Sequence, residues 1–143
     1  FAIWVKTDAI STNKVIAAKK ENIASTTGWM MWQFNDDLHF TVRGNFDRVA
    51  VVESVLTVGK WVLAVGTFEV SGANAISRVY VDDGTLSGES FDNPHDGNYS
   101  NNDNFRIGTT SDEAGDWNGQ LAFPRLWNRK LEISEIQQLE RLR

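Results

Sequence analysis

The chain has 143 residues, which fits one domain, and it has no cysteine, which excludes disulfides, thiolate metal sites and cysteine nucleophiles. Its 14 basic and 19 acidic side chains give a net charge of −5, which argues against a nucleic-acid-binding surface and gives no attraction to anionic lipid. No run approaches the roughly 20 apolar residues that a membrane-spanning helix needs, so we expect no membrane insertion.

The first part of the chain reads as short strands separated by turns. It begins at Phe1, inside the first of these strands and without a signal-peptide pattern, so we interpret it as a fragment or a processed chain. The fourth strand alternates apolar and polar residues, so Leu38 and Phe40 should face a core and His39 the solvent. Strands are predicted at residues 1–6, 14–19, 28–34, 37–43 and 48–54, with a turn at Asn35-Asp36-Asp37.

The second part continues the pattern with longer and less regular strands. Residues 60–70 are apolar on both faces, which predicts a central strand that is covered on both sides. Further strands are predicted at residues 76–82, 105–109 and 117–127. Pro124 cannot donate a hydrogen bond, so we expect an edge, a bulge or a strand end at that position.

Only the tail has a helical pattern. Ile133, Ile136 and Leu139 keep a helical spacing, and Ser134 followed by Gln137 could form a capping box. So short a helix must dock its apolar side on the rest of the protein. Many short strands and one terminal helix predict an all-β fold, an antiparallel sandwich or barrel, with a short C-terminal helix.

Five motifs occur in a characteristic order. They are Phe1-Ala2-Ile3-Trp4-Val5-Lys6, Gly59-Lys60-Trp61-Val62, Val79-Tyr80-Val81-Asp82, Phe105-Arg106-Ile107-Gly108 and a closing stretch that runs from Gly119-Gln120-Leu121 through Arg125-Leu126-Trp127-Asn128-Arg129-Lys130-Leu131 to Glu135-Ile136. This order resembles the laminin G-like (pentraxin-like) domains of the concanavalin A-like lectin/glucanase superfamily. The resemblance implies an antiparallel β-sandwich of the jelly-roll type, as a single domain over residues 1–143.

The chain departs from the family pattern in three places. Ala122-Phe123-Pro124 replaces an acidic pair, and Glu132 stands where serine usually caps the helix, so we expect the cap at Ser134. The family's first strand or strands are lacking, which could leave an open sheet edge. A homo-oligomer formed through that edge is therefore one hypothesis.

Catalytic relatives on this fold are glycosidases that use two carboxylates. In the laminarinase-like branch these carboxylates lie on one strand, spaced as E-x-D-x-x-E, and that spacing does not occur here. Neither His39 nor His95 belongs to a recognisable metal or nucleophile motif. We therefore predict that the domain is not an enzyme.

The polar stretch 92–104 is a candidate calcium loop. Calcium is bound by six to eight oxygen atoms, and this stretch is rich in carboxylate and amide oxygens. An EF-hand is excluded because Pro94 breaks the pattern and no helices flank it. The alternative is a solvated turn, since the same residue types favour turns. The candidate calcium ligands are Asp92, Asp96, Asn98 and Asp103.

Aromatic residues beside polar side chains are candidates for sugar stacking. Trp117 lies between Asp116 and Asn118 in a loop and should be exposed, and Tyr99 in the polar loop is the next candidate. Trp29 and Trp32 have opposite parity on one strand, so one should face the core and the other the outside. The family positions of Trp4, Trp61 and Trp127 imply packing, and the other rings could equally cover the edge of the core.

From the resemblance, the leading hypothesis is a non-catalytic carbohydrate-binding or adhesion module of a larger extracellular, cell-surface or virion protein. The alternatives are a structural or protein-interaction module without a sugar site, and a divergent glycoside hydrolase. An exposed aromatic side chain with polar neighbours on one face favours the first of these functions, and a large apolar patch at an open edge favours the second.

Overall fold

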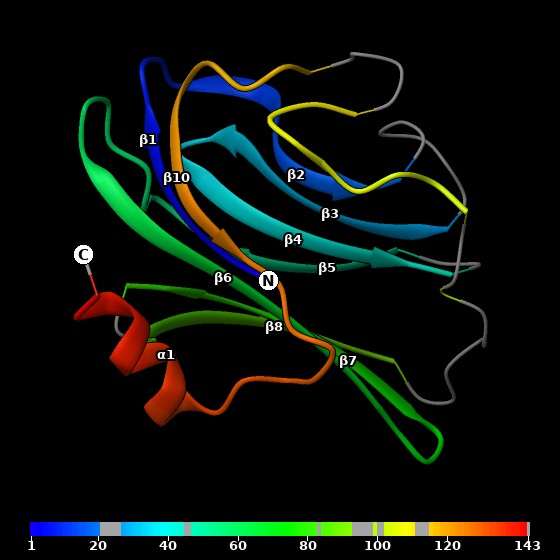
Figure 1. Cartoon of the computed structure of the whole chain (residues 1–143). Helices are drawn as coiled ribbons and strands as arrows, with labels where there is room; N and C mark the ends of the chain where they lie inside the picture. Colours follow the sequence, from blue (N-terminus) through cyan, green and yellow to red (C-terminus); the bar gives the residue numbers. More distant parts are fainter. Residues whose placement is uncertain are drawn as a thin grey trace.

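Two stacked antiparallel sheets form the body of the protein in its computed structural model (Figure 1). The structure describes residues 1–20, 27–44, 47–82, 84–92, 99, 102–110 and 115–142. Sheet A contains, in spatial order, β10 (Gly119–Arg125), β1 (Ala2–Thr7), β6 (Trp61–Ser71), β7 (Asn74–Val81) and β8 (Leu86–Asp92). Sheet B contains β5 (Asp47–Val52), β4 (Asp37–Arg43), β3 (Gly28–Asn35), β2 (Ser11–Lys19) and β9 (Arg106–Ile107).

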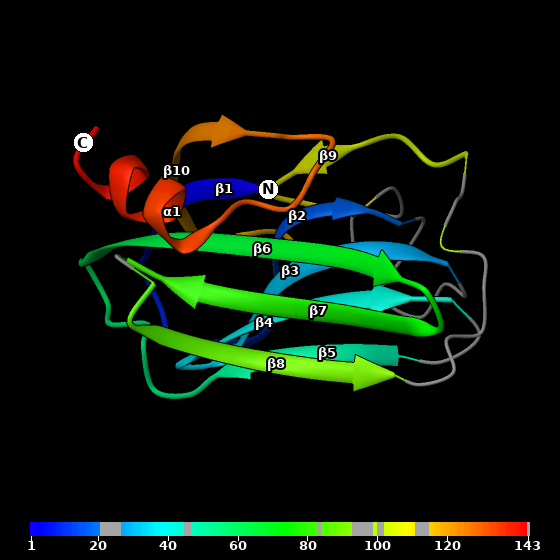
Figure 2. The same ribbon diagram turned by 90° about the horizontal axis from the view of Figure 1, so that it is seen from below.

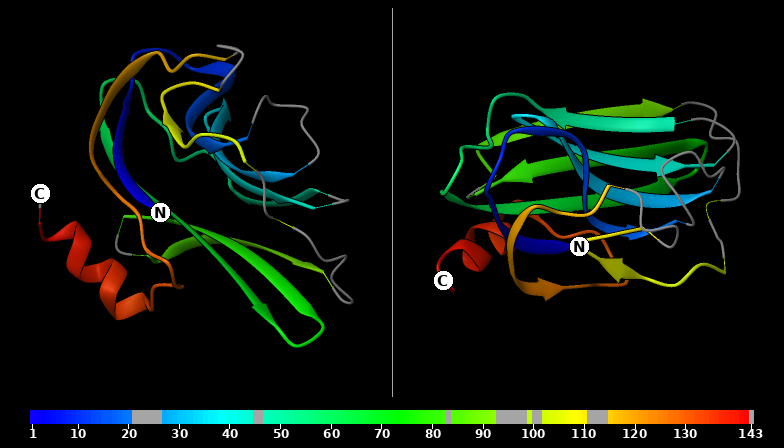
Figure 3. Two further views of the ribbon diagram at one scale, coloured as in Figure 1. Left: turned by 45° about the vertical axis from the view of Figure 1, so that its right-hand side comes forward. Right: turned by 90° about the horizontal axis from the view of Figure 1, so that it is seen from above.

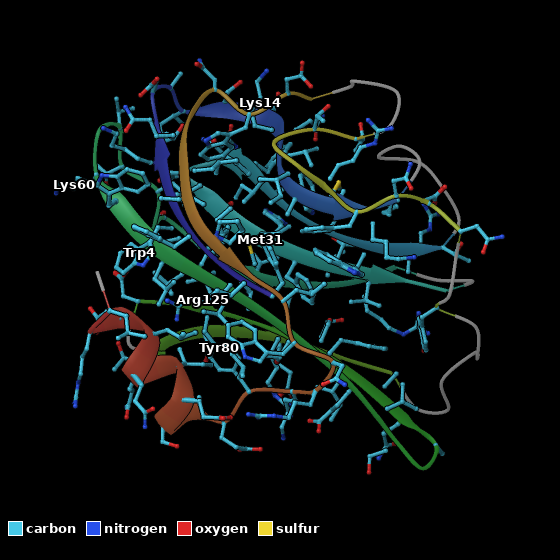
Figure 4. All side chains as sticks on the ribbon, viewed as in Figure 1. Trp4, Lys14, Met31, Lys60, Tyr80 and Arg125 are labelled. Atoms are coloured by element: carbon cyan, nitrogen blue, oxygen red, sulfur yellow. The ribbon has the colours of Figure 1, made fainter. Side chains whose placement is uncertain are left out.

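The main core lies between the sheets, where alternate residues of each strand point inward. Ile3, Met31, Leu38 and Val79 are fully buried there, and Figure 4 labels Met31 between the two layers. This arrangement confirms the predicted sandwich. The strand β6 has the main core on one face and a second apolar cluster on the other, as its two-sided pattern predicts.

The helix α1 (Ile133–Glu140) lies beside the outer face of sheet A (Figure 2), and the second cluster lies between this helix and the sheet. Trp4 and Tyr80 project from the sheet and Ile136 from the helix, and Ile136 is fully buried. The predicted docking of the tail is therefore confirmed. Among the described residues, no helix is long and apolar enough to cross a membrane.

The helix is capped two residues before the predicted cap at Ser134. Its N-cap is Glu132, whose backbone N–H donates to Glu135 Oε2 at 2.9 Å. The guanidinium group of Arg129 donates to both carboxylate oxygens of Glu135, at 2.6 and 2.7 Å. These bonds lower the pKa of Glu135 to about 2. The glutamate side chains therefore replace the serine that the cap prediction required.

The edge strand β10 has a bulge where the sequence contains Pro124. Across the sheet, Ala2 pairs with Arg125 and Trp4 with Ala122, so two residues of β10 oppose one residue of β1. This confirms the prediction of an edge or bulge at Pro124. A bulge and a proline make an edge less able to pair with another strand. The predicted homo-oligomer through an open edge stays a prediction.

The two sheets pack closely at two positions where the sequence has glycine. A Cβ atom at Gly66 in β6 would overlap the ring of Phe40 in β4. A Cβ atom at Gly88 in β8 would overlap the backbone carbonyl of Val51 in β5. The edge strands β5 and β8 therefore meet backbone to backbone, which closes this side of the sandwich (Figure 2).

Replacing Gly88 by alanine is expected to destabilise the domain by about 2 kcal/mol or more, because the added methyl group meets backbone that cannot move aside easily. Chemical denaturation measures this change in the free energy of unfolding. Ser87→Ala, one residue away and exposed, is the matched control and should change stability by less than about 0.5 kcal/mol. Equal stability of the two variants would contradict the close packing of β5 against β8.

Candidate functional site

Three aromatic rings meet on the outer face of sheet B, the face turned toward the viewer in the right-hand view of Figure 3. Trp32 and Phe34 are two residues apart on β3 and so share a face, and His39 of the neighbouring strand β4 pairs with Trp32. The ring centroids of Trp32 and His39 are 4.4 Å apart, and both rings lie 6.1 Å from Phe34. We call these three residues the sheet-B aromatic cluster.

The indole of Trp32 is held in a fixed orientation. Its Nε1 donates to the Thr41 hydroxyl oxygen at 2.9 Å, and its ring packs against Val15 and Met30. Thr41 is only 4% exposed beneath it, so the polar face predicted for β4 is not simply solvated. Trp32 and His39 are half-buried and Phe34 is 39% exposed, so part of the cluster faces solvent. The ring of Phe34 stands edge-on to Trp32 and His39, at interplanar angles of 72° and 77°. The fixed and partly exposed indole of Trp32 is therefore the ring suited to stacking on the apolar face of a ligand.

Charged groups lie beside the cluster, at the β2 edge of the sheet. In one row across the sheet, Asp116 pairs with Val15 of β2, Val15 pairs with Trp32 of β3, and Trp32 pairs with His39 of β4. In the next row on the same face, Arg106 of β9 pairs with Ala18, Ala18 pairs with Met30, and Met30 pairs with Thr41. Because paired residues share a face, Asp116 and Arg106 stand on the same face as the cluster.

The side chains of Asp116 and Arg106 differ in their partners. Asp116 is exposed, and its Oδ1 accepts from the Thr109 hydroxyl at 2.6 Å. Arg106 is half-buried and has no ion pair in the described part of the chain, where its Nε also has no hydrogen-bond acceptor. Because Nε is buried, the terminal nitrogens are the atoms of Arg106 that could bind an anionic or carbonyl oxygen of a ligand.

His39 lies in an environment that disfavours its charged form. Burial lowers its pKa from 6.5, and the neighbouring Asp37 carboxylate opposes this only in part. Neither ring nitrogen has a hydrogen-bond partner among the described residues. At neutral pH His39 is therefore an uncharged aromatic ring in the cluster, and not the solvated surface histidine that its position in the sequence predicts.

The other predicted stacking residues lie elsewhere. Trp117 is half-buried and packs against the core between the sheets, which differs from its predicted exposure. Asp116 and Asn118 on either side of it are exposed, so the three residues do not form one surface. Trp29 faces the core, within 6.0 Å of the Phe40 ring centroid, and Trp32 faces outward, so the parity argument is confirmed.

Tyr99 is half-buried between side chains of β6 and β5. Its ring centroid lies 4.8 Å from that of Phe68, and the guanidinium carbon of Arg48 lies 5.2 Å from its centroid. Tyr99 packs against the main core, so its observed contacts support a role in packing.

The candidate calcium loop is largely outside the described residues. Asp96 and Asn98 lie outside them, and the side chain of Asp92 at the end of β8 is not described. Asp103 is described and is half-buried. Among the described residues, no cluster of three or more histidine, aspartate or glutamate side chains could hold a metal ion. The calcium site stays a prediction.

Two glutamate side chains on sheet A form ion pairs with the same arginine. Arg78 binds Glu69 and Glu89, and Lys130 also pairs with Glu69 at 3.2 Å. The hydrogen bond from Arg78 lowers the pKa of Glu69, whereas a general acid of a glycosidase needs a raised pKa. This pair therefore lacks the arrangement that hydrolysis requires.

A cleft of about 300 Å³ opens between the sheets near Phe1. Its walls include Trp29, Phe40 and Phe68, whose rings also pack on the core, together with Trp127. Arg129 at its rim is bound to Glu135. The cleft therefore opens onto side chains of the core on one side, and Thr67 and Asn128 also line it.

The comparison with protein families agrees with this architecture. A model of laminin G type, described as the concanavalin A-like lectin/glucanases superfamily, matches residues 1–137. The chain belongs to this superfamily. No curated protein matches the chain in sequence.

A solved structure has the same concanavalin A-like fold. It is the CBM40 of the Ruminococcus gnavus IT-sialidase bound to α2,3-sialyllactose, with a TM-score of 0.70 and 11% sequence identity. The match covers 97% of this chain and 80% of that one. At this identity the likeness shows the fold alone, and it confirms the predicted β-sandwich.

His39 predicts a pH dependence of stability. Because burial lowers its pKa, the unfolded chain binds more protons than the folded chain as the pH falls below 6.5. The free energy of unfolding should therefore decrease between about pH 7.5 and about pH 5.5. His39→Gln should lack this part of the decrease. Denaturant unfolding of both proteins across the range measures it, and parallel curves would contradict the assigned environment of His39.

Proposed function

We propose that this domain is a non-catalytic carbohydrate-binding module that binds its glycan on the outer face of sheet B. The observation that carries the proposal is the sheet-B aromatic cluster, in which an oriented and partly exposed Trp32 stands beside Phe34 and His39. A sugar ring would stack its C–H face on the indole of Trp32, with Phe34 edge-on beside it. Its hydroxyl groups would bond to Asp116 and Arg106 at the neighbouring edge.

The comparisons support the class of ligand. The superfamily is named for lectins and glucanases, and the CBM40 neighbour was solved with α2,3-sialyllactose, which carries a carboxylate. In the present domain Arg106 is the group on the cluster's face that could pair with such a carboxylate. A sialylated glycan is therefore the first ligand class to test.

The remaining parts of the proposal follow the family. We place the domain in an extracellular, cell-surface or virion protein, and we propose calcium as a ligand of the 92–104 stretch. The alternative function is a structural or protein-interaction module without a sugar site. The exposed side chains of Phe123 and Leu126 near the edge strand β10 are the observation that favours this alternative.

A glycan array tests the proposal directly. We expect the purified domain to bind a defined set of glycans, and Trp32→Ala to raise the Kd for the strongest of them at least about tenfold, or about 1.4 kcal/mol. Phe34→Ala, which removes a more exposed ring, should have a smaller effect in the same direction. Val70→Ala, on an exposed position of sheet A, is the control and should bind as the wild type does.

Two further conditions separate the components of the proposal. Repeating the array with chelator tests calcium, because binding that survives chelation excludes a calcium-dependent site. Arg106→Gln should weaken binding to sialylated glycans more than to their neutral counterparts. A folded wild-type domain that binds no glycan on the array would overturn the proposed function and favour the interaction module.

A further inference from the structure

A second aromatic surface lies on the outer face of sheet A, on the opposite side of the sandwich from the sheet-B aromatic cluster. Trp4, Trp61, Ala122 and Phe123 line a hollow of about 200 Å³ with almost entirely apolar walls. We call these four residues the sheet-A notch. Trp4, Trp61 and Ala122 belong to the apolar cluster that also contains Ile136, so the notch lies on the same face of the sheet as the helix α1.

The register of sheet A explains how the notch is built. Trp4 stands between Ala122 of β10 and Leu63 of β6, so its indole forms the floor. Trp61, at the start of β6, forms one wall. The bulge in β10 turns Phe123 onto the same face as Ala122, and its ring forms the other wall.

Phe123 is held in a conformation that neither its residue type nor burial explains. Its φ is +52°, in the left-handed region that bulky side chains rarely adopt. Its side chain is 64% exposed, so little burial offsets the strain. Backbone strain of this kind collects at functional sites, and here its effect is to present an aromatic ring to solvent beside two tryptophans.

Polar side chains with free hydrogen-bonding capacity stand beside the notch. Lys6 lies in one cross-strand row between Gln120 and Trp61, and its Nζ is 5.4 Å from the Trp61 ring centroid. Neither Lys6 nor Gln120 makes a side-chain hydrogen bond to another described residue. An ammonium group and an amide beside aromatic walls can bind ligand oxygens while the rings contact carbon.

We propose that the sheet-A notch is a second glycan site, which binds one pyranose ring between Trp61 and Phe123 with its hydroxyl groups on Lys6 and Gln120. The volume is below the roughly 300–1,000 Å³ of pockets for drug-sized ligands, which suits a single sugar ring. The class of ligand rests on the proposed function, whereas the position of the site does not. Two sites on opposite faces would let one domain bind two glycan chains at once, with a gain in avidity on a glycan-dense surface.

An NMR titration that follows the indole N–H resonances of the six tryptophans tests this proposal. The probes are the methyl glycosides of glucose, galactose, mannose, N-acetylglucosamine and N-acetylneuraminic acid, each added to about 20 mM so that millimolar Kd values are detected. Trp61→Phe and Trp32→Phe assign the two resonances of interest. We expect at least one probe to shift the Trp61 resonance saturably, in the wild type and in Trp32→Ala.

Phe123→Gly separates ligand binding from folding. Glycine adopts positive φ without strain, so this variant should keep or raise the melting temperature while the response of Trp61 weakens at least about fivefold. Val70→Ala, another exposed apolar position on sheet A, is the control and should leave the response unchanged.

The outcomes distinguish this proposal from the proposed function. A shift of Trp32 with no shift of Trp61 for any probe would leave the sheet-B site intact and overturn the notch. A shift of Trp61 without Trp32 would support the notch and contradict the sheet-B placement. No shift of either resonance would overturn the notch, as would an unchanged Trp61 response in Phe123→Gly.

Discussion

The direct contact between the backbones of the two sheets is the constraint on which the rest of the structure depends. The ring of Phe40 packs directly on the backbone of Gly66 in β6, and the backbone of Gly88 in β8 packs directly on β5. Both contacts exclude even a methyl group, so they fix the spacing and rotation of one sheet relative to the other. With that spacing fixed, alternate residues of every strand face outward in rows, and these rows form the two candidate binding surfaces.

Different groups cover the two outer faces, and they determine which side chains each face presents to a ligand. On sheet A the helix α1 covers part of the face, because Ile136 packs on Trp4 and Tyr80, and the notch remains beside it. On sheet B the aromatic side chains cover the strands themselves, with Trp32 bonded to Thr41 and stacked on His39. On sheet A, Arg78 binds the carboxylates of Glu69 and Glu89, and Lys130 also binds Glu69, so this pair is not free.

The sequence allowed most of the fold to be predicted, because alternation and turn residues report burial directly. It did not reveal β8, whose strand contains Gly88 and polar residues and depends on contact with β5. Parity identified Trp32 as one of two candidates on its strand. It missed Phe34, although alternation along β3 places this residue on the same face as Trp32. Arg106 joins Trp32 only through the register of β2, β3 and β9, which no local pattern reports. Trp117 lies against the core because its segment leads from the edge of sheet B, at Asp116, to β10 of sheet A. The polar residues around it in the sequence do not indicate this contact. The sequence indicated the notch only through Pro124, which predicts an edge or bulge in β10. The strained backbone of Phe123 is seen only in the structure.

The central claim is that a glycan binds on sheet B against Trp32. A crystal structure of the domain with the glycan that gives the strongest array signal tests it most directly. The account predicts sugar density stacked on Trp32, with oxygens within hydrogen-bond distance of Arg106 or Asp116. Density confined to the cleft between the sheets, against Trp29 and Trp127, would contradict the claim.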